Sequence, residues 1–76
     1  MPRSQHSDRY RRFRELLVHE RRRKDLTQAE VARRLKRPQS YVSKYEAGER
    51  RLDVIEFLEI AEVLGAQPWS ILRRLR

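Results

Sequence analysis

A short stretch after Pro38 carries four polar side chains whose types and spacing suit contact with the edges of DNA bases. They are Gln39, Ser40, Ser43 and Lys44. On an α-helix, positions 39 and 40 fall in the first turn and positions 43 and 44 one turn later, so all four share a face. A glutamine can pair with adenine through two hydrogen bonds, a lysine can reach guanine acceptors, and serines can donate to bases or phosphate. The same residues would also make an ordinary solvated helix face. The elements around them must therefore decide between a DNA-contacting face and a merely solvated one.

Those elements predict a helix-turn-helix. Thr27 and Glu30 have the spacing of a capping box, which begins a helix that buries Val31, Ala32 and Leu35. Pro38 restricts the preceding residue to an extended conformation and fits the first turn of the next helix. That helix is expected over residues 39–47, with Val42 and Tyr45 buried and Gly48 as a left-handed C-cap. Its polar face then points away from the core.

Three more helices complete an all-α, five-helix prediction. Residues 1–7 are expected to form a mobile basic arm, and residues 8–76 a single domain. A first helix is expected over residues 8–24, and a fourth begins after Asp53 and ends at Gly65. The fourth helix is expected to bury Ile55 or Phe57, Leu58, Ala61 and Leu64. A last helix begins at Pro68.

The composition points to a polyanion as partner. The chain of 76 residues holds 19 lysines and arginines against 11 acidic residues, a net charge of +8. Nucleic acid is the commonest polyanion, although a basic surface can also serve only solubility. The absence of cysteine excludes disulfides and thiolate metal sites. Neither a signal peptide nor a membrane-spanning run is visible, so we expect a cytoplasmic protein.

These features together resemble the Cro and phage-repressor, or XRE-type, helix-turn-helix family. The residues that carry the resemblance are the segments 26–32 (LTQAEVA), 39–48 (QSYVSKYEAG) and 58–65 (LEIAEVLG). The resemblance implies a five-helix bundle that binds operator DNA as a homodimer and needs no cofactor. The resulting hypothesis is a transcriptional repressor that binds a pseudo-palindromic operator through its third helix.

The resemblance also assigns roles to single residues. Gln28 matches a family glutamine that binds phosphate, and Arg21 and Glu46 match a partly buried ion pair between the first and third helices. Arg50 and Arg51 follow the third helix and are expected on the flanking DNA backbone. Tyr41 is a further candidate for the sugar–phosphate edge.

Three departures from the family pattern concern the turns and the first helix. Asp25 and Lys36 stand where the family usually has glycine and the chain is left-handed, which costs about 1 kcal/mol for a lysine. Arg37 replaces an apolar turn residue, so its stem is expected to pack while its head reaches phosphate. Glu20 stands where alanine is usual.

Dimer contacts are expected from the C-terminal segment, through Trp69, Ile71, Leu72 and Leu75. Alternatively, Trp69 and Leu72 only complete the monomer core. Three other functions compete with DNA binding as explanations of the sequence. Two histidines, His6 and His19, without a cysteine or an isolated carboxylate pair, argue against an enzyme. A basic amphipathic first helix allows membrane-surface binding. An antitoxin-like module, with a toxin-like protein partner, remains the alternative function.

Overall fold

The computed structural model describes residues 7–76, which form five helices and no strand. The arm expected over residues 1–7, with His6, lies outside the described residues except for Ser7. The helices are α1 (Asp8–Arg23), α2 (Gln28–Leu35), α3 (Gln39–Ala47), α4 (Val54–Leu64) and α5 (Pro68–Arg73). All five agree with the predicted elements to within a residue or two.

Local signals fix the ends of these helices. Thr27 begins α2 and Asp53 begins α4, and each makes a complete capping box, with Glu30 and Glu56 respectively. Gly48 and Gly65 end α3 and α4 in the left-handed conformation. Pro38 was expected within the first turn of α3 but stands one position earlier, as its N-cap.

The two predicted left-handed turns are present without glycine. Asp25 has φ 57°, and Lys36, which ends α2, has φ 60°. An aspartate adopts this conformation more readily than a lysine does, because its short polar side chain can hydrogen-bond locally. The turn between α2 and α3 therefore keeps its usual shape at the cost of strain at Lys36.

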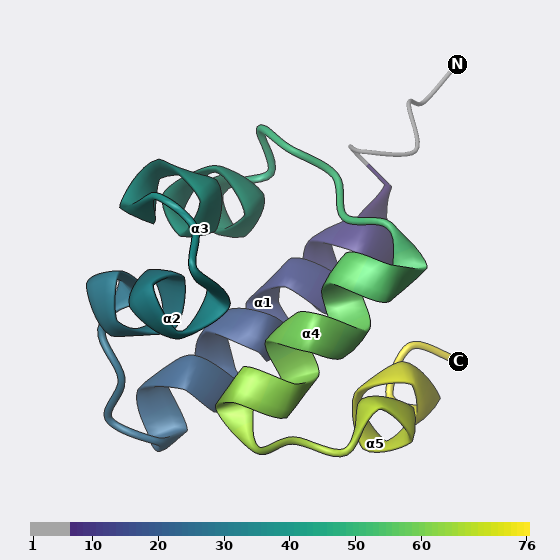
Figure 1. Ribbon diagram of the computed structural model, residues 1–76. Helices are drawn as coiled ribbons and strands as arrows, with labels where there is room; N and C mark the ends of the chain where they lie inside the picture. The colour runs from purple at the N-terminus through teal and green to yellow at the C-terminus, as the bar shows by residue number, and fades with distance from the viewer. Residues whose placement is uncertain (1–6) are drawn as a thin grey trace.

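The helices form one bundle around α1 (Figure 1). α2 and α3 pack against each other, α2 also contacts α4, and α3 also contacts α1. The rings of Phe13 in α1 and Phe57 in α4 meet edge to face with centroids 5.2 Å apart. α5 lies on the other side of the bundle from α3, where it contacts α1 and α4. Among residues 7–76, no helix has the length and apolar character to cross a membrane.

The buried face of α4 differs from the predicted one. Ala61 and Leu64 are buried as expected, and of the alternatives Ile55 and Phe57 it is Phe57 that is buried, while Ile55 is 63% exposed. Leu58 was expected to be buried but is 43% exposed. Ile60, which the sequence analysis did not select, is fully buried. The α4 sequence is apolar on more than one face, so a helical period alone fits two rotations about its axis. Contacts with α1 and α2 select the face that carries Phe57 and Ile60.

Candidate nucleic-acid interface

The third helix has one buried face and one open face. Val42 and Tyr45 are almost completely buried, and Tyr41 is buried with them. On the other side, Gln39, Ser40 and Lys44 are exposed and Ser43 is half-buried. The structure thus places all four candidate base-contacting residues together on the solvent side of α3.

Two details at the start of α3 affect its hydrogen-bonding capacity. The N-cap, Pro38, has no side-chain cap bond to offer, so the first turn of α3 keeps unsatisfied amides. The Ser43 hydroxyl donates to the Ser40 carbonyl oxygen at 3.2 Å. In this arrangement Ser43 presents an oxygen acceptor, whereas Gln39 and Lys44 keep their donors free within the described residues.

Glu46, near the end of α3, joins three helices. Its carboxylate accepts hydrogen bonds from Arg21 Nε at 2.7 Å and Arg21 Nη2 at 3.1 Å. It also accepts one from Gln28 Nε2 at 2.8 Å. Arg21 donates a further bond to the Leu26 carbonyl oxygen at 2.8 Å. The predicted ion pair between α1 and α3 is present, and it extends to the start of α2 through Gln28.

A second arginine of α1 holds the last turn of α3. Arg14 Nη1 donates to the Glu46 backbone oxygen at 2.8 Å. Its guanidinium lies so close to Gly48 that a Cβ there would come within 2.9 Å of the Arg14 Cζ and Nε atoms. Gly48 is therefore required by its φ of +84°, and a larger residue there would also have to displace the Arg14 guanidinium. Since cations favour the negative end of a helix dipole, Arg14 also stabilises the end of α3 electrostatically.

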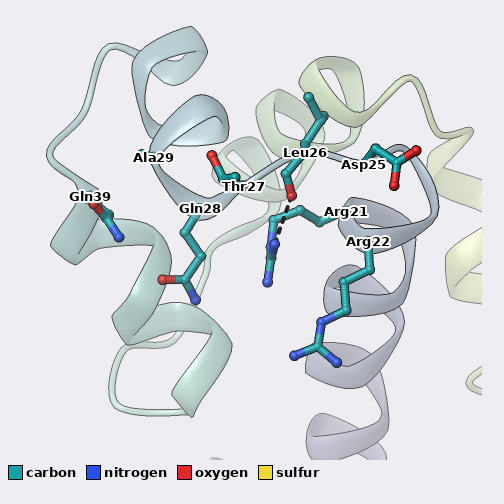
Figure 2. Close-up of a pocket in the computed structure, with 8 residues that line it drawn as sticks. All are labelled: Arg21, Arg22, Asp25, Leu26, Thr27, Gln28, Ala29 and Gln39. Atoms are coloured by element: carbon teal, nitrogen blue, oxygen red, sulfur yellow. Dashed lines mark hydrogen bonds between the residues drawn. The ribbon is translucent and has the colours of Figure 1, made fainter.

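The start of α2 borders an open cleft with a volume of about 470 Å³ (Figure 2). Gln28 and Gln39 stand on one side of this cleft, and Arg22 stands on the other. The capping box uses the amides of Thr27 and Glu30, while the amides of Gln28 and Ala29 have no intrahelical partner. A helix N-terminus beside an arginine favours an anion, so the cleft is suited to a phosphate next to α3.

Beyond the other edge of α3, two arginines contact one tyrosine ring. Arg37 Cζ lies 4.6 Å and Arg50 Cζ 4.7 Å from the Tyr41 ring centroid. Arg50 also donates two hydrogen bonds to the Glu56 carboxylate, at 3.1 and 2.8 Å. The pKa of Glu56 is lowered, first by these bonds and then by the cap bond from the Asp53 backbone. Burial raises the pKa of Tyr41.

The Arg51 side chain also contacts a tyrosine ring, in this case that of Tyr10 in α1. Its Cζ lies 4.2 Å from the ring centroid of Tyr10, and the Leu52 amide donates to the Tyr10 hydroxyl oxygen at 3.2 Å. Arg51 itself is exposed and has no carboxylate partner among residues 7–76. The structure thus leaves this guanidinium available to a ligand.

The candidate dimer residues of the C-terminal segment do not share one environment. Trp69 is 64% exposed and Leu72 is 49% exposed, so neither completes the monomer core. Ile71 is 3% exposed and belongs to that core, and Leu75 packs against it while partly buried. Trp69 and Leu72 therefore leave apolar surface exposed, and Ile71 does not.

Two comparisons with known proteins agree with this arrangement. A family model described as helix-turn-helix matches residues 19–68. The chain belongs to the XRE-type helix-turn-helix family. A solved structure of an XRE-family like protein from Pseudomonas syringae pv. tomato str. DC3000 is 48% identical, with a TM-score of 0.85. The match covers 88% of this chain and 82% of that chain. No curated protein matches the chain.

Membership of this family makes the protein a DNA-binding regulator and not an enzyme.

Sequence reasoning missed several contacts that build the interface. Arg14 was not selected from the sequence, although its guanidinium donates to the Glu46 carbonyl oxygen in the last turn of α3. The Arg50–Glu56 pair and the contact between Tyr10 and Arg51 join residues from different elements, so no local spacing signals them. Only the three-dimensional arrangement reveals these contacts.

Proposed function

We propose that this protein is a sequence-specific transcriptional repressor that binds a pseudo-palindromic operator as a homodimer. The observation that carries the proposal is the open polar face of α3 above a buried face held by Val42 and Tyr45. A helix of this kind enters the major groove with its N-terminal turns toward the bases. The complex would act on bacterial DNA in the cytoplasm by blocking access of polymerase to a promoter.

Base recognition is assigned to the open face of α3. Gln39 would pair with adenine, and Lys44, about one and a half turns later, would reach the guanine acceptors. Ser40 and Ser43 would contact neighbouring base edges, with Ser43 acting as an acceptor because its hydrogen is bonded to the Ser40 carbonyl oxygen. These four contacts would set the operator sequence.

Contacts to the DNA backbone are assigned to both sides of α3. Gln28 and the first amides of α2 lie at the cleft on one side, and Arg37 and Arg51 lie beyond the other. Such contacts would supply affinity and register without reading sequence. Tyr41 and Arg50 lie beside Arg37 on the same flanking surface, and Arg50 is already paired with Glu56.

Dimer formation is assigned to the apolar surface of α4 and α5. The exposed large hydrophobic residues of the described chain all lie there: Val54, Ile55, Leu58, Trp69 and Leu72. Several large apolar side chains exposed on neighbouring helices favour an interaction site in a small domain. Binding of such a dimer to successive major grooves requires that the two third helices lie about 34 Å apart.

Selection of bound duplexes from a random DNA pool tests the proposal directly. We expect the selected sequences to share two half-sites in inverted order. On that operator, Gln39→Ala or Lys44→Ala should lose about 1–3 kcal/mol and relax discrimination at one base pair. Arg51→Ala should weaken binding to all duplexes alike and lower the salt slope by about one unit. Equal losses on all sequences from both kinds of variant would refute the assignment of base contacts.

A further inference from the structure

Tyr41, near the start of α3, is held in a fixed position by the core of the bundle. The residue is 7% exposed, and its ring packs edge to face on Tyr45, with centroids 5.6 Å apart and an interplanar angle of 76°. Tyr45 is itself 1% exposed, so the ring of Tyr41 rests on the core of the bundle. A guanidinium that contacts this ring is therefore held at a defined place relative to α3.

The two guanidinium groups on this ring differ in their charge partners. Arg50 forms a two-bond ion pair with Glu56, whose side chain is 13% exposed. Arg37 is exposed, and no carboxylate among residues 7–76 lies within ion-pair distance of it. One guanidinium is thus already neutralised, and the other has a free charge.

The backbone on both sides of Arg37 is also fixed. Its amide donates to the Ala32 carbonyl oxygen at 2.9 Å, and it lies between the left-handed Lys36 and the ring of Pro38. The remaining freedom of Arg37 is therefore in its side chain. An arginine side chain loses much conformational entropy when it is immobilised. That loss weakens ligand binding unless the free protein already holds the side chain in its bound position.

We propose that Tyr41 is a positioning residue that holds the Arg37 guanidinium ready for a DNA phosphate, and that Arg50 braces the Tyr41 ring through Glu56. The proposal rests on the proposed DNA binding and divides the roles among the flanking residues. A guanidinium stacked on a ring keeps its N–H donors in its own plane, where they remain open to phosphate oxygens. Arg50 links the same ring to the first turn of α4 and does not bind phosphate.

A double-mutant cycle on a mixed-sequence duplex tests this role, because backbone contacts do not depend on sequence. The variants are Tyr41→Leu, Arg37→Ala and their combination, each checked by circular dichroism for helix content. We expect Tyr41→Leu to weaken binding about two- to fivefold when Arg37 is present. It should weaken binding no further once Arg37 is alanine. Tyr41→Phe keeps the ring and should bind as the wild type does.

The salt dependence of binding separates the two arginines without any change at Tyr41. Arg37→Ala should reduce the salt slope by about one unit, as the loss of one phosphate contact does. Arg50→Ala should leave the slope unchanged, because its charge is already paired with Glu56. An equal reduction by both variants, or an equal effect of Tyr41→Leu with and without Arg37, overturns the inference. Failure of the wild-type protein to bind any duplex would overturn the proposed function as well.

Discussion

The α2–α3 half of the molecule and the α4–α5 half are built by the same local devices. α2 and α4 each begin at a capping box, and α3 and α4 each end at a left-handed glycine. α1 and its C-cap residue each supply a cation to the end of a glycine-terminated helix: Arg14 donates to the Glu46 carbonyl oxygen in α3, and Lys24 donates to the Leu64 carbonyl oxygen in α4 at 2.6 Å. The two halves are therefore secured in the same way.

They differ in what they expose. The outer face of α3 is polar and uncapped at its start, whereas the described exposed large hydrophobic residues all lie on α4 and α5. Because the two halves share their helix-ending devices, folding needs do not explain this difference. It is explained if one half faces a polyanion and the other an apolar partner.

Removal of the Glu46 carboxylate should produce the largest effect. Glu46→Ala strands Arg21, whose side chain is 11% exposed, without its carboxylate partner, and should lower the free energy of unfolding by about 3 kcal/mol. The matched change in the other half is Glu56→Ala. Its partner Arg50 is 38% exposed, so water can solvate the freed charge and the loss should be about 1 kcal/mol. Urea unfolding measures both, and equal losses would contradict the difference in burial.

The two C-cap glycines provide a second matched pair. An alanine at either position is strained because φ is positive, which costs about 1–2 kcal/mol. Gly48→Ala should be the more harmful, because its Cβ meets the guanidinium of Arg14 at 2.9 Å. The Cβ in Gly65→Ala meets only the flexible end of Lys24, at 3.0 Å. Thermal unfolding and duplex affinity should be measured together. Only Gly48→Ala should weaken DNA binding, since it displaces the arginine that holds α3, and equal weakening by both would refute this.

The sequence predicted local structure well and long-range contacts poorly. Thr27, Asp53, Gly48 and Gly65 mark helix ends through their own backbone preferences, so reading them requires no knowledge of the fold. The outward face of α3 followed from the burial of Val42 and Tyr45. The prediction of the buried face of α4 was partly wrong. It left Ile55 or Phe57 open and selected Leu58 in place of Ile60, because all four side chains are apolar and suit a core equally well. The ion pair of Arg21 with Glu46 was implied by family resemblance and not by spacing.

Substitutions on the apolar surface of α4 and α5 should change association without changing the fold. Trp69→Ala or Leu58→Ala should raise the dimer dissociation constant about tenfold while thermal unfolding of the monomer shifts little. Arg33→Ala, on the exposed face of α2, is the control and should leave the dissociation constant unchanged. Sedimentation velocity over a range of concentrations reports this. If the wild-type protein stays monomeric on its operator, the apolar surface of α4 and α5 does not join two copies of the chain.

The smallest expected effect is a difference in pH dependence between the two capping boxes. The pKa of Glu30 is lowered mainly by bonds within its box, whereas that of Glu56 is lowered first by Arg50 and then by its box. A carboxyl whose folded pKa lies below its ordinary value of 4.5 stabilises the fold above pH 4.5 and loses this contribution as the pH falls through the folded value. Glutamine preserves the capping geometry but removes the titration. Glu56→Gln should therefore flatten the acid limb of the unfolding free energy, and Glu30→Gln should flatten it less. If Glu30→Gln had the larger effect, the ion pair with Arg50 would not be what sets the acid stability of the α4 half.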